Sequence, residues 1–154
     1  MKRFIQPLAL FLGILLLSSN SFLGDKDPLH GRKYDTNAIE YREGAPKPGA
    51  KSFPYVLEFK NGKLFYDLAA DAKGGGFDQW IKYEIVKDSV YTEEEVEKRY
   101  FEVKASKEDD DGRLLKLIIK IDETDIEGSY QVIRREKLMK HFEFNGEEKS
   151  KKKK

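Results

Sequence analysis

The chain has 154 residues, of which 37% are charged and 39% hydrophobic, and it contains no cysteine. Structural disulfides and lipid attachment to an amino-terminal cysteine are therefore excluded. The formal net charge of +1 hides an asymmetry: without Lys2, Arg3 and the five lysines at 149 and 151–154, 22 basic residues stand against 28 acidic ones. Such an acidic body argues against a nucleic-acid-binding domain, which carries a basic face.

The amino terminus has the pattern of a signal peptide. Lys2 and Arg3 form a positive start, residues 4–17 are almost all apolar, and small polar residues follow up to Ser21. The apolar stretch of about 14 residues is shorter than the roughly 20 that cross a bilayer as a helix. An uncleaved anchor is therefore the less favoured alternative. We expect removal of residues 1–21 and export to the periplasm or the cell exterior, as a protein that is not integral to the membrane.

Beyond the amino terminus, almost every segment alternates apolar and polar residues, as half-buried strands do. Asn61-Gly62 lies between two alternating segments and favours a two-residue hairpin turn. Asp111-Gly112 is a second hairpin signal. Eight strands are expected, at or near Arg32–Arg42, Phe53–Lys60, Lys63–Ala70, Phe77–Lys87, Arg99–Ser106, Arg113–Asp122, Ile126–Val132 and His141–Phe144.

Two of the connections are longer than the others. Residues 43–52 contain two prolines and two glycines and are expected to form an irregular loop. In the second, residues 88–98, the sequence Thr92–Glu95 fits a helix capping box and predicts one short helical turn. The Gly74–Gly76 run lacks the lysine and serine of a phosphate-binding loop. It is expected to form a tight bend.

An antiparallel series of eight strands, each with one apolar face, predicts an all-β fold. Closing the series into an up-and-down (meander) barrel hides the strand edges and pools the apolar faces. We expect this barrel to be a single domain at 22–146, with a two-sheet β-sandwich as the alternative. The lack of a long crossover connection favours the barrel. Charged residues on the outward faces argue against a membrane-embedded barrel, which needs an apolar outer band.

Several turn and aromatic motifs occur in a recognisable order. They are Leu57–Leu64, Gly76-Phe77, Tyr83, Ile126–Tyr130 and Phe142–Gly146. In this order the chain resembles a group of small exported bacterial barrels that are calycin-like, similar in outline to lipocalins, and largely without an assigned role. The resemblance covers most of residues 53–146 and implies the same closed barrel.

The chain departs from that family pattern at two places. Family members often carry a cysteine just before the Gly-Phe pair and a tryptophan in the sixth strand. This chain has Gly75 at the first position and Leu117 or nearby aliphatic residues at the second. A redox or tryptophan-dependent role in such relatives therefore does not transfer to this chain.

Few residues suggest catalysis or metal binding. His141 and Glu143 share one face of a strand and would suit a metal, but Phe142 is the natural core residue, which turns the pair toward solvent. The acidic run at 109–111 lacks the ligand spacing of a calcium loop. Cysteine is absent, and neither of the two histidines has an evident partner for nucleophilic catalysis. We expect a non-enzymatic protein with no catalytic residues, no metal site and no cofactor.

The aromatic residues are numerous for a small domain and have two interpretations. One is core packing. The other is that some of them line the interior or rim of a barrel cavity that holds an apolar ligand. The candidates for this ligand site are Tyr66, Phe77, Trp80, Tyr83 and Tyr130.

The sequence therefore predicts a non-enzymatic binding module for an apolar small ligand or for a partner such as an envelope protein. The alternative is a structural or interaction protein of the envelope with a filled core and no ligand. The lysine-rich end at 147–154 is expected to be a disordered, solubilising tail. Its alternative role is weak attraction to an anionic surface.

Overall fold

The computed structural model describes residues 26–77 and 80–150. The predicted signal peptide lies outside these ranges, as do the last four lysines. Within them the chain has one short helix and nine strands, all joined in one sheet. They are β1 (Lys33–Arg42), β2 (Ala45–Pro46), β3 (Phe53–Lys60), β4 (Lys63–Tyr66), α1 (Asp67–Ala70), β5 (Ile81–Glu93), β6 (Val96–Glu108), β7 (Arg113–Asp122), β8 (Asp125–Arg134) and β9 (Lys137–Glu148).

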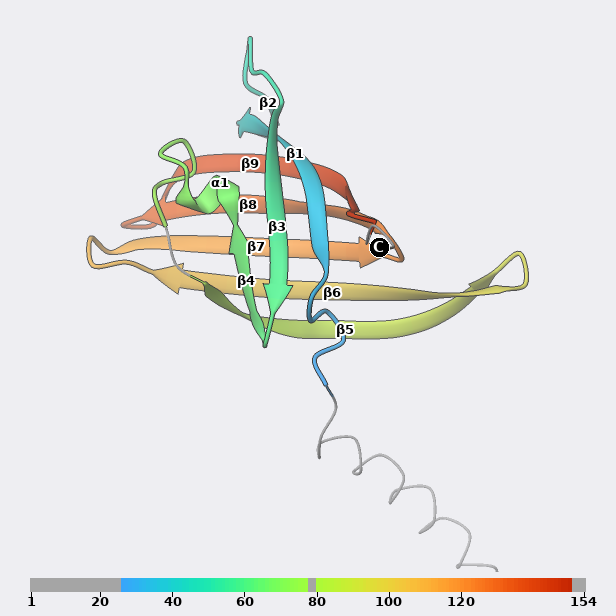
Figure 1. Ribbon diagram of the computed structural model, residues 1–154. Coiled ribbons are helices and arrows are strands. Elements are labelled where there is room, and N and C mark those ends of the chain that lie inside the picture. The colour runs from blue at the N-terminus through green and yellow to red at the C-terminus, as the bar shows by residue number, and fades with distance from the viewer. Residues whose placement is uncertain (1–25, 78–79, 151–154) are drawn as a thin grey trace, which may run out of the picture.

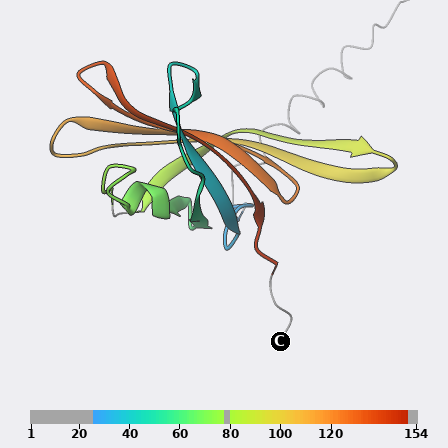
Figure 2. The ribbon, with the colours of Figure 1, turned by 90° about the horizontal axis from the view of Figure 1, so that it is seen from above.

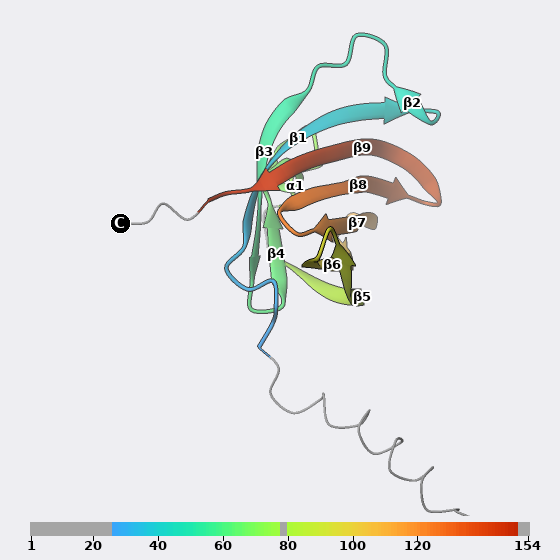
Figure 3. The same cartoon turned by 90° about the vertical axis from the view of Figure 1, so that its right-hand side faces the viewer.

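The sheet is an antiparallel meander that closes into a ring, which confirms the predicted all-β, barrel-like fold. Each strand from β3 to β8 pairs with the next one along the chain. β1 pairs with β3 on one side and with β9 on the other, so the two ends of the meander meet. In Figure 1, β1, β3 and β4 cross in front of strands β5–β9. Figure 3 shows β1 beside β9 where the ring closes.

The predicted helical turn at Thr92–Glu95 is wrong. β5 and β6 run through this segment as a long hairpin, and only Glu94 and Glu95 lie between them. Both have positive φ, 49° and 66°, as a two-residue hairpin turn requires. A capping box is a weak local signal, and here the ladder between two long strands outweighs it.

The predicted strand Lys63–Ala70 is too long. β4 ends at Tyr66 and α1 follows it. The reason is that the neighbouring residues Leu68 and Ala69 are both buried. A strand turns only one of two neighbours inward, whereas a helical turn buries both. At the other end of the chain, β9 continues to Glu148, past the expected end of the barrel at residue 146.

The core lies inside the ring and follows the predicted period of two. In β7, for example, Leu115, Leu117 and Ile119 are buried, and the residues between them are exposed. Buried leucines also lie outside the strands. Leu68 of α1 and Leu29 of the amino-terminal turn are fully buried. The turn with Leu29 is attached to β3 by the hydrogen bond from Gly31 N to Phe59 O, at 2.8 Å.

No helix among the described residues has the length and apolar character needed to cross a membrane.

Candidate functional site

Two of the five predicted ligand-site residues meet inside the barrel. The rings of Tyr66 and Tyr130 lie 6.2 Å apart, and both side chains are almost fully buried. The Tyr66 hydroxyl is hydrogen-bonded to the Thr36 hydroxyl at 3.1 Å. The Tyr130 hydroxyl donates to the Gly74 carbonyl at 2.5 Å. Both phenols therefore already have partners within the chain.

The other three predicted residues have separate surroundings. Phe77 is buried beneath the Arg113 guanidinium, which lies 5.1 Å from the ring centroid. Tyr83 is half-buried and donates a hydrogen bond to the Asp27 carboxylate. Trp80 is 39% exposed, and it packs at a tilt against Phe65.

The interior of the described barrel is filled by side chains. An internal cavity that could hold a water molecule would leave accessible surface on the side chains that form its wall. The largest inward-facing side chains have 0–2% of their surface accessible. They include Tyr34, Leu57, Phe59, Leu64, Tyr66, Phe101, Leu115, Leu117 and Tyr130. Eight-stranded barrels are of the size at which side chains alone can fill the interior.

The buried tyrosines make a prediction for alkaline stability. Burial raises the pKa of the Tyr34, Tyr66 and Tyr130 phenols above the ordinary value. Because these phenols have a higher pKa in the folded state than in the unfolded state, ionisation favours the unfolded chain. Their contribution to the stability of the fold is therefore complete below a pH of about 10 and is lost as the pH rises further. We expect the free energy of unfolding by urea to change little between pH 8 and pH 9 and to fall above a pH of about 10.

A double variant, Tyr66→Phe with Tyr130→Phe, provides the control for this prediction. It removes two of the three groups, so the fall above a pH of about 10 should be shallower than in the parent protein. Equal slopes in the two proteins would contradict the role given to these phenols.

The histidine–carboxylate pair faces outward, as predicted. His141 Nε2 lies 2.5 Å from Glu143 Oε1, and the ring of Tyr41 lies 5.7 Å from the imidazole. Phe142, between them in sequence, is buried. Across the described parts of the chain, no group of three or more His, Asp or Glu side chains is placed to hold a metal ion.

The acidic run at 109–111 and the glycine run both form turns. Asp109 accepts hydrogen bonds from the backbone N–H groups of Asp111 and Arg113, and it forms an ion pair with the Arg113 side chain at 2.6 Å. The N–H groups of Gly74 and Gly75 donate to the Asp71 carbonyl, at 3.0 Å each. These contacts explain both runs as local structure.

Comparison with known proteins adds no relative. No family model, no curated protein and no solved structure matches the chain. The resemblance to calycin-like barrels therefore stays a prediction.

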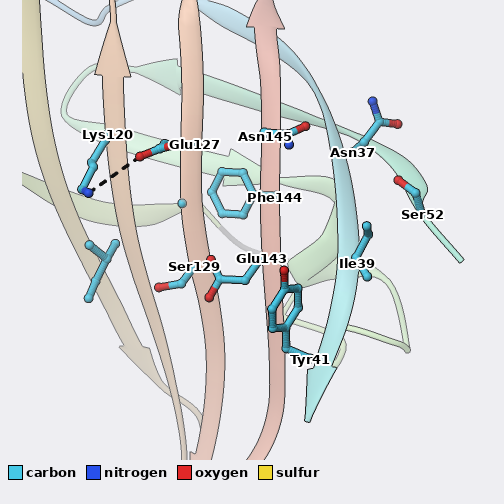
Figure 4. A pocket seen from close by; sticks show the side chains of 12 residues that line it. Asn37, Ile39, Tyr41, Ser52, Lys120, Glu127, Ser129, Glu143, Phe144 and Asn145 are labelled. Carbon is cyan, nitrogen blue, oxygen red and sulfur yellow. Dashed lines mark ion pairs between the residues drawn. The ribbon is translucent and has the colours of Figure 1, made fainter. Parts of the chain in front are cut away.

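One hollow of about 550 Å³ lies on the outer face of β7, β8, β9 and β1 (Figure 4). Its lining is mixed, with serine and asparagine side chains beside isoleucine and tyrosine. Its charged groups have partners: Lys120 pairs with Glu127 at 3.7 Å, and Glu143 contacts His141. With Lys120, Glu127 and Glu143 in its lining, this hollow has a formal surplus of one negative charge, because His141 is charged only when protonated. It offers no cluster of unpaired like charges that would select a ligand.

A second hollow, of about 500 Å³, differs in its charge. It lies at the rim of the barrel, between the loop after β2, the loop after α1 and β9. We call it the lysine hollow. Its lining includes Glu40, Lys47, Lys51, Phe53, Lys73, Lys140 and Phe142.

The floor of the lysine hollow is aromatic. Phe142 is buried in the core and Phe53 is half-buried. The ammonium group of Lys73 lies 3.4 Å from the centroid of the Phe53 ring, in cation–π contact. The same hollow thus offers an apolar surface and a cation next to each other.

Positive charge exceeds negative charge in the lysine hollow. Its single carboxylate, that of Glu40, is paired with Lys47 at 3.1 Å. Lys140 donates to the backbone carbonyl of Lys73 at 2.5 Å and has no carboxylate partner among the described residues, so its charge is uncompensated there. Neither Lys51 nor Lys73 has a carboxylate partner in the described part of the chain. Like charges held near one another repel, and a bound anion would remove that repulsion.

Sequence reasoning did not find the lysine hollow. Its four lysines occur singly at positions 47, 51, 73 and 140, among a total of 29 basic residues. No local spacing distinguishes them. They meet because β9 closes the ring against β1, next to the loop before β3.

Proposed function

We propose that this chain is a non-enzymatic binding module that takes up an anionic ligand with an apolar part in the lysine hollow. The observation that carries the proposal is the surplus of lysine charge around an aromatic floor, on a protein body that is otherwise acidic. The apolar part of the ligand would pack on Phe53 and Phe142, and its acidic group would lie between Lys51 and Lys73.

The filled interior supports a site at the rim rather than inside the barrel. An apolar ligand between Tyr66 and Tyr130 would have to displace packed side chains and break the hydrogen bond from Tyr130 to Gly74. At the rim hollow, a ligand would displace only the exposed Lys73 side chain from the Phe53 ring. The polar groups around it are amines, backbone carbonyls and one carboxylate, that of Glu40, which is paired with Lys47. They suit recognition of an anion rather than acid–base chemistry.

Export remains part of this proposal, since the ligand would be met outside the cytoplasm.

A second candidate function is that of an envelope interaction protein without a small ligand. The packed interior favours it, and it would be preferred if the hollow binds no amphiphile.

The test compares three ligands that share an eight-carbon chain: octyl phosphate, octanoate and octanol. We expect both anions to shift the backbone NMR signals of Phe53 and Lys73, and octanol to bind at least about tenfold more weakly. The double variant Lys51→Gln with Lys73→Gln should lose about tenfold in affinity for the anions, since both lysines are exposed and an exposed ion pair contributes up to about 1 kcal/mol.

The matched control is Lys60→Gln with Lys63→Gln. It removes the same charge from the β3–β4 turn, at the other end of β3 from Phe53. This control variant should bind both anions like the parent protein. Equal binding of octanol and octyl phosphate, or an unchanged affinity in the Lys51 and Lys73 double variant, would refute the proposal.

A further inference from the structure

β5 has a ladder partner on only one side for most of its length. β6 pairs with it from Tyr83 to Glu93, whereas β4 reaches only Ile81 and Lys82. Among the described residues, no strand pairs with the other edge of β5 between residues 84 and 93. Figure 2 shows the β5–β6 hairpin projecting away from the rest of the barrel. Another chain could therefore approach this edge.

The projecting hairpin also concentrates exposed apolar side chains. Of the eight large hydrophobic residues exposed in the described chain, four lie on it: Val86, Val90, Tyr91 and Val96. Native proteins protect exposed edges with lysines, prolines or short strands. This edge is long, contains no proline and has one lysine, Lys87. It is thus poorly protected against pairing with another strand.

The hairpin turn fixes which backbone groups point outward. Glu93 and Val96 flank the two-residue turn and form its closing, hydrogen-bonded pair. Antiparallel pairs alternate between hydrogen-bonded and non-hydrogen-bonded. Along β5 the residues bonded to β6 are therefore every second one back from Glu93. It follows that Asp88, Val90 and Thr92 direct their N–H and C=O groups to the free edge.

We propose that two copies of this chain pair along this edge, antiparallel, with the two-fold axis at Val90. In this register Lys87 lies directly opposite Glu93 of the partner subunit. The Glu93 carboxylate also pairs with Lys98 of its own chain, and in the dimer Lys87 of the partner subunit joins that pair. Symmetry repeats the contact, so the dimer gains two such contacts. In the ladder between the two subunits, Lys87 and Glu93 occupy non-hydrogen-bonded positions, because their own N–H and C=O groups bond to β6. Opposite side chains come closest at such positions.

Other registers lack this match of charges. An axis at Asp88 places two aspartates directly opposite each other, which is unfavourable. An axis at Ser89 places Lys87 opposite a tyrosine, and an axis at Tyr91 places Asp88 opposite Glu94. The charge pattern of residues 87–93 thus selects Val90 as the centre. The strand that covers this edge is therefore β5 of a second copy of the chain.

The first test measures the mass of the purified full-length gene product by sedimentation, from about 1 µM to about 1 mM, a range that spans weak to moderate affinities. We expect a monomer–dimer equilibrium. Val90→Pro should abolish the dimer, because proline removes an N–H that points to the free edge. That N–H makes no bond to β6, so the melting temperature of the monomer should change little. A monomer at every concentration, or association beyond the dimer, would overturn the proposal.

The second test does not depend on how proline is tolerated. Lys87→Glu and Glu93→Lys should each weaken the dimer by about tenfold, because the two-fold axis repeats the repulsion. The combined variant restores opposite charges and should regain most of the affinity. Lys116→Glu, on the outer face of β7, makes the same charge change away from the edge and should have no effect. Failure of the combined variant to recover would also overturn the proposal.

Discussion

Replacing Gly146 with alanine is expected to disrupt the closure of the barrel. Gly146 lies opposite Thr36 where β9 pairs with β1. A Cβ atom at this position would lie 2.0 Å from the Asp35 carbonyl oxygen and 2.7 Å from the Thr36 Cα atom. Both are backbone atoms, so no side-chain rotation relieves the clash. We expect a loss of about 3 kcal/mol or more in the free energy of unfolding, measured by urea titration.

Gly112→Ala is the matched control for this variant. Gly112 has φ of +69° and no neighbouring atom within 4 Å of a Cβ. Its replacement therefore meets only the strain of the left-handed conformation, about 1 kcal/mol. If Gly146→Ala costs no more than Gly112→Ala, β1 and β9 do not approach each other as closely as the structure has them. Hydrogen exchange should further show that the loss of protection in Gly146→Ala begins in β1 and β9.

The strands were predictable because each has one buried and one solvated face. Arg113–Asp122 illustrates this point. Leucine or isoleucine occupies every inward position from 115 to 121 there, Lys116 and Lys120 lie on the outward face, and the predicted bounds are those of the strand. A shift of one residue would turn every apolar side chain to solvent. Closure into a ring followed from the need to cover strand edges, although the open edge of β5 was not foreseen.

The features that the sequence did not reveal depend on contacts between distant residues. At Thr92–Glu95 the local pattern fits a helix start, and only pairing with β6 decides for a hairpin. The lysine hollow exists because Lys140 of β9 meets Lys73 of a loop far away in the chain. Whether the interior is hollow also depends on the fit between side-chain volumes and ring size. Periodicity reports which side chains point inward, but not whether they fill the space.

Truncating Tyr130 should show the consequence of a filled interior. Tyr130→Ala removes a fully buried ring that packs against Tyr66 and Phe142. We expect a loss of about 3–5 kcal/mol in the free energy of unfolding, the cost of a large cavity. A side chain lining an empty ligand cavity would cost much less, because its removal would leave few packing contacts unmade. A loss below about 1 kcal/mol, within the range of surface substitutions, would show that the interior is not packed around this ring.

The same residue separates packing from hydrogen bonding when only the hydroxyl is removed. Tyr130→Phe leaves the buried Gly74 carbonyl without its donor and should cost about 1–3 kcal/mol. Tyr34 supplies the matched control, because it is equally buried and its hydroxyl has no hydrogen-bond partner in the described chain. Tyr34→Phe therefore removes an unsatisfied polar group and should leave the protein as stable as the parent or more stable by up to about 1 kcal/mol. Identical chemistry at two equally buried positions should thus change stability in opposite directions. If both variants lose stability equally, the Tyr34 hydroxyl has a partner. If neither variant loses stability, the hydrogen bond from Tyr130 to Gly74 contributes nothing.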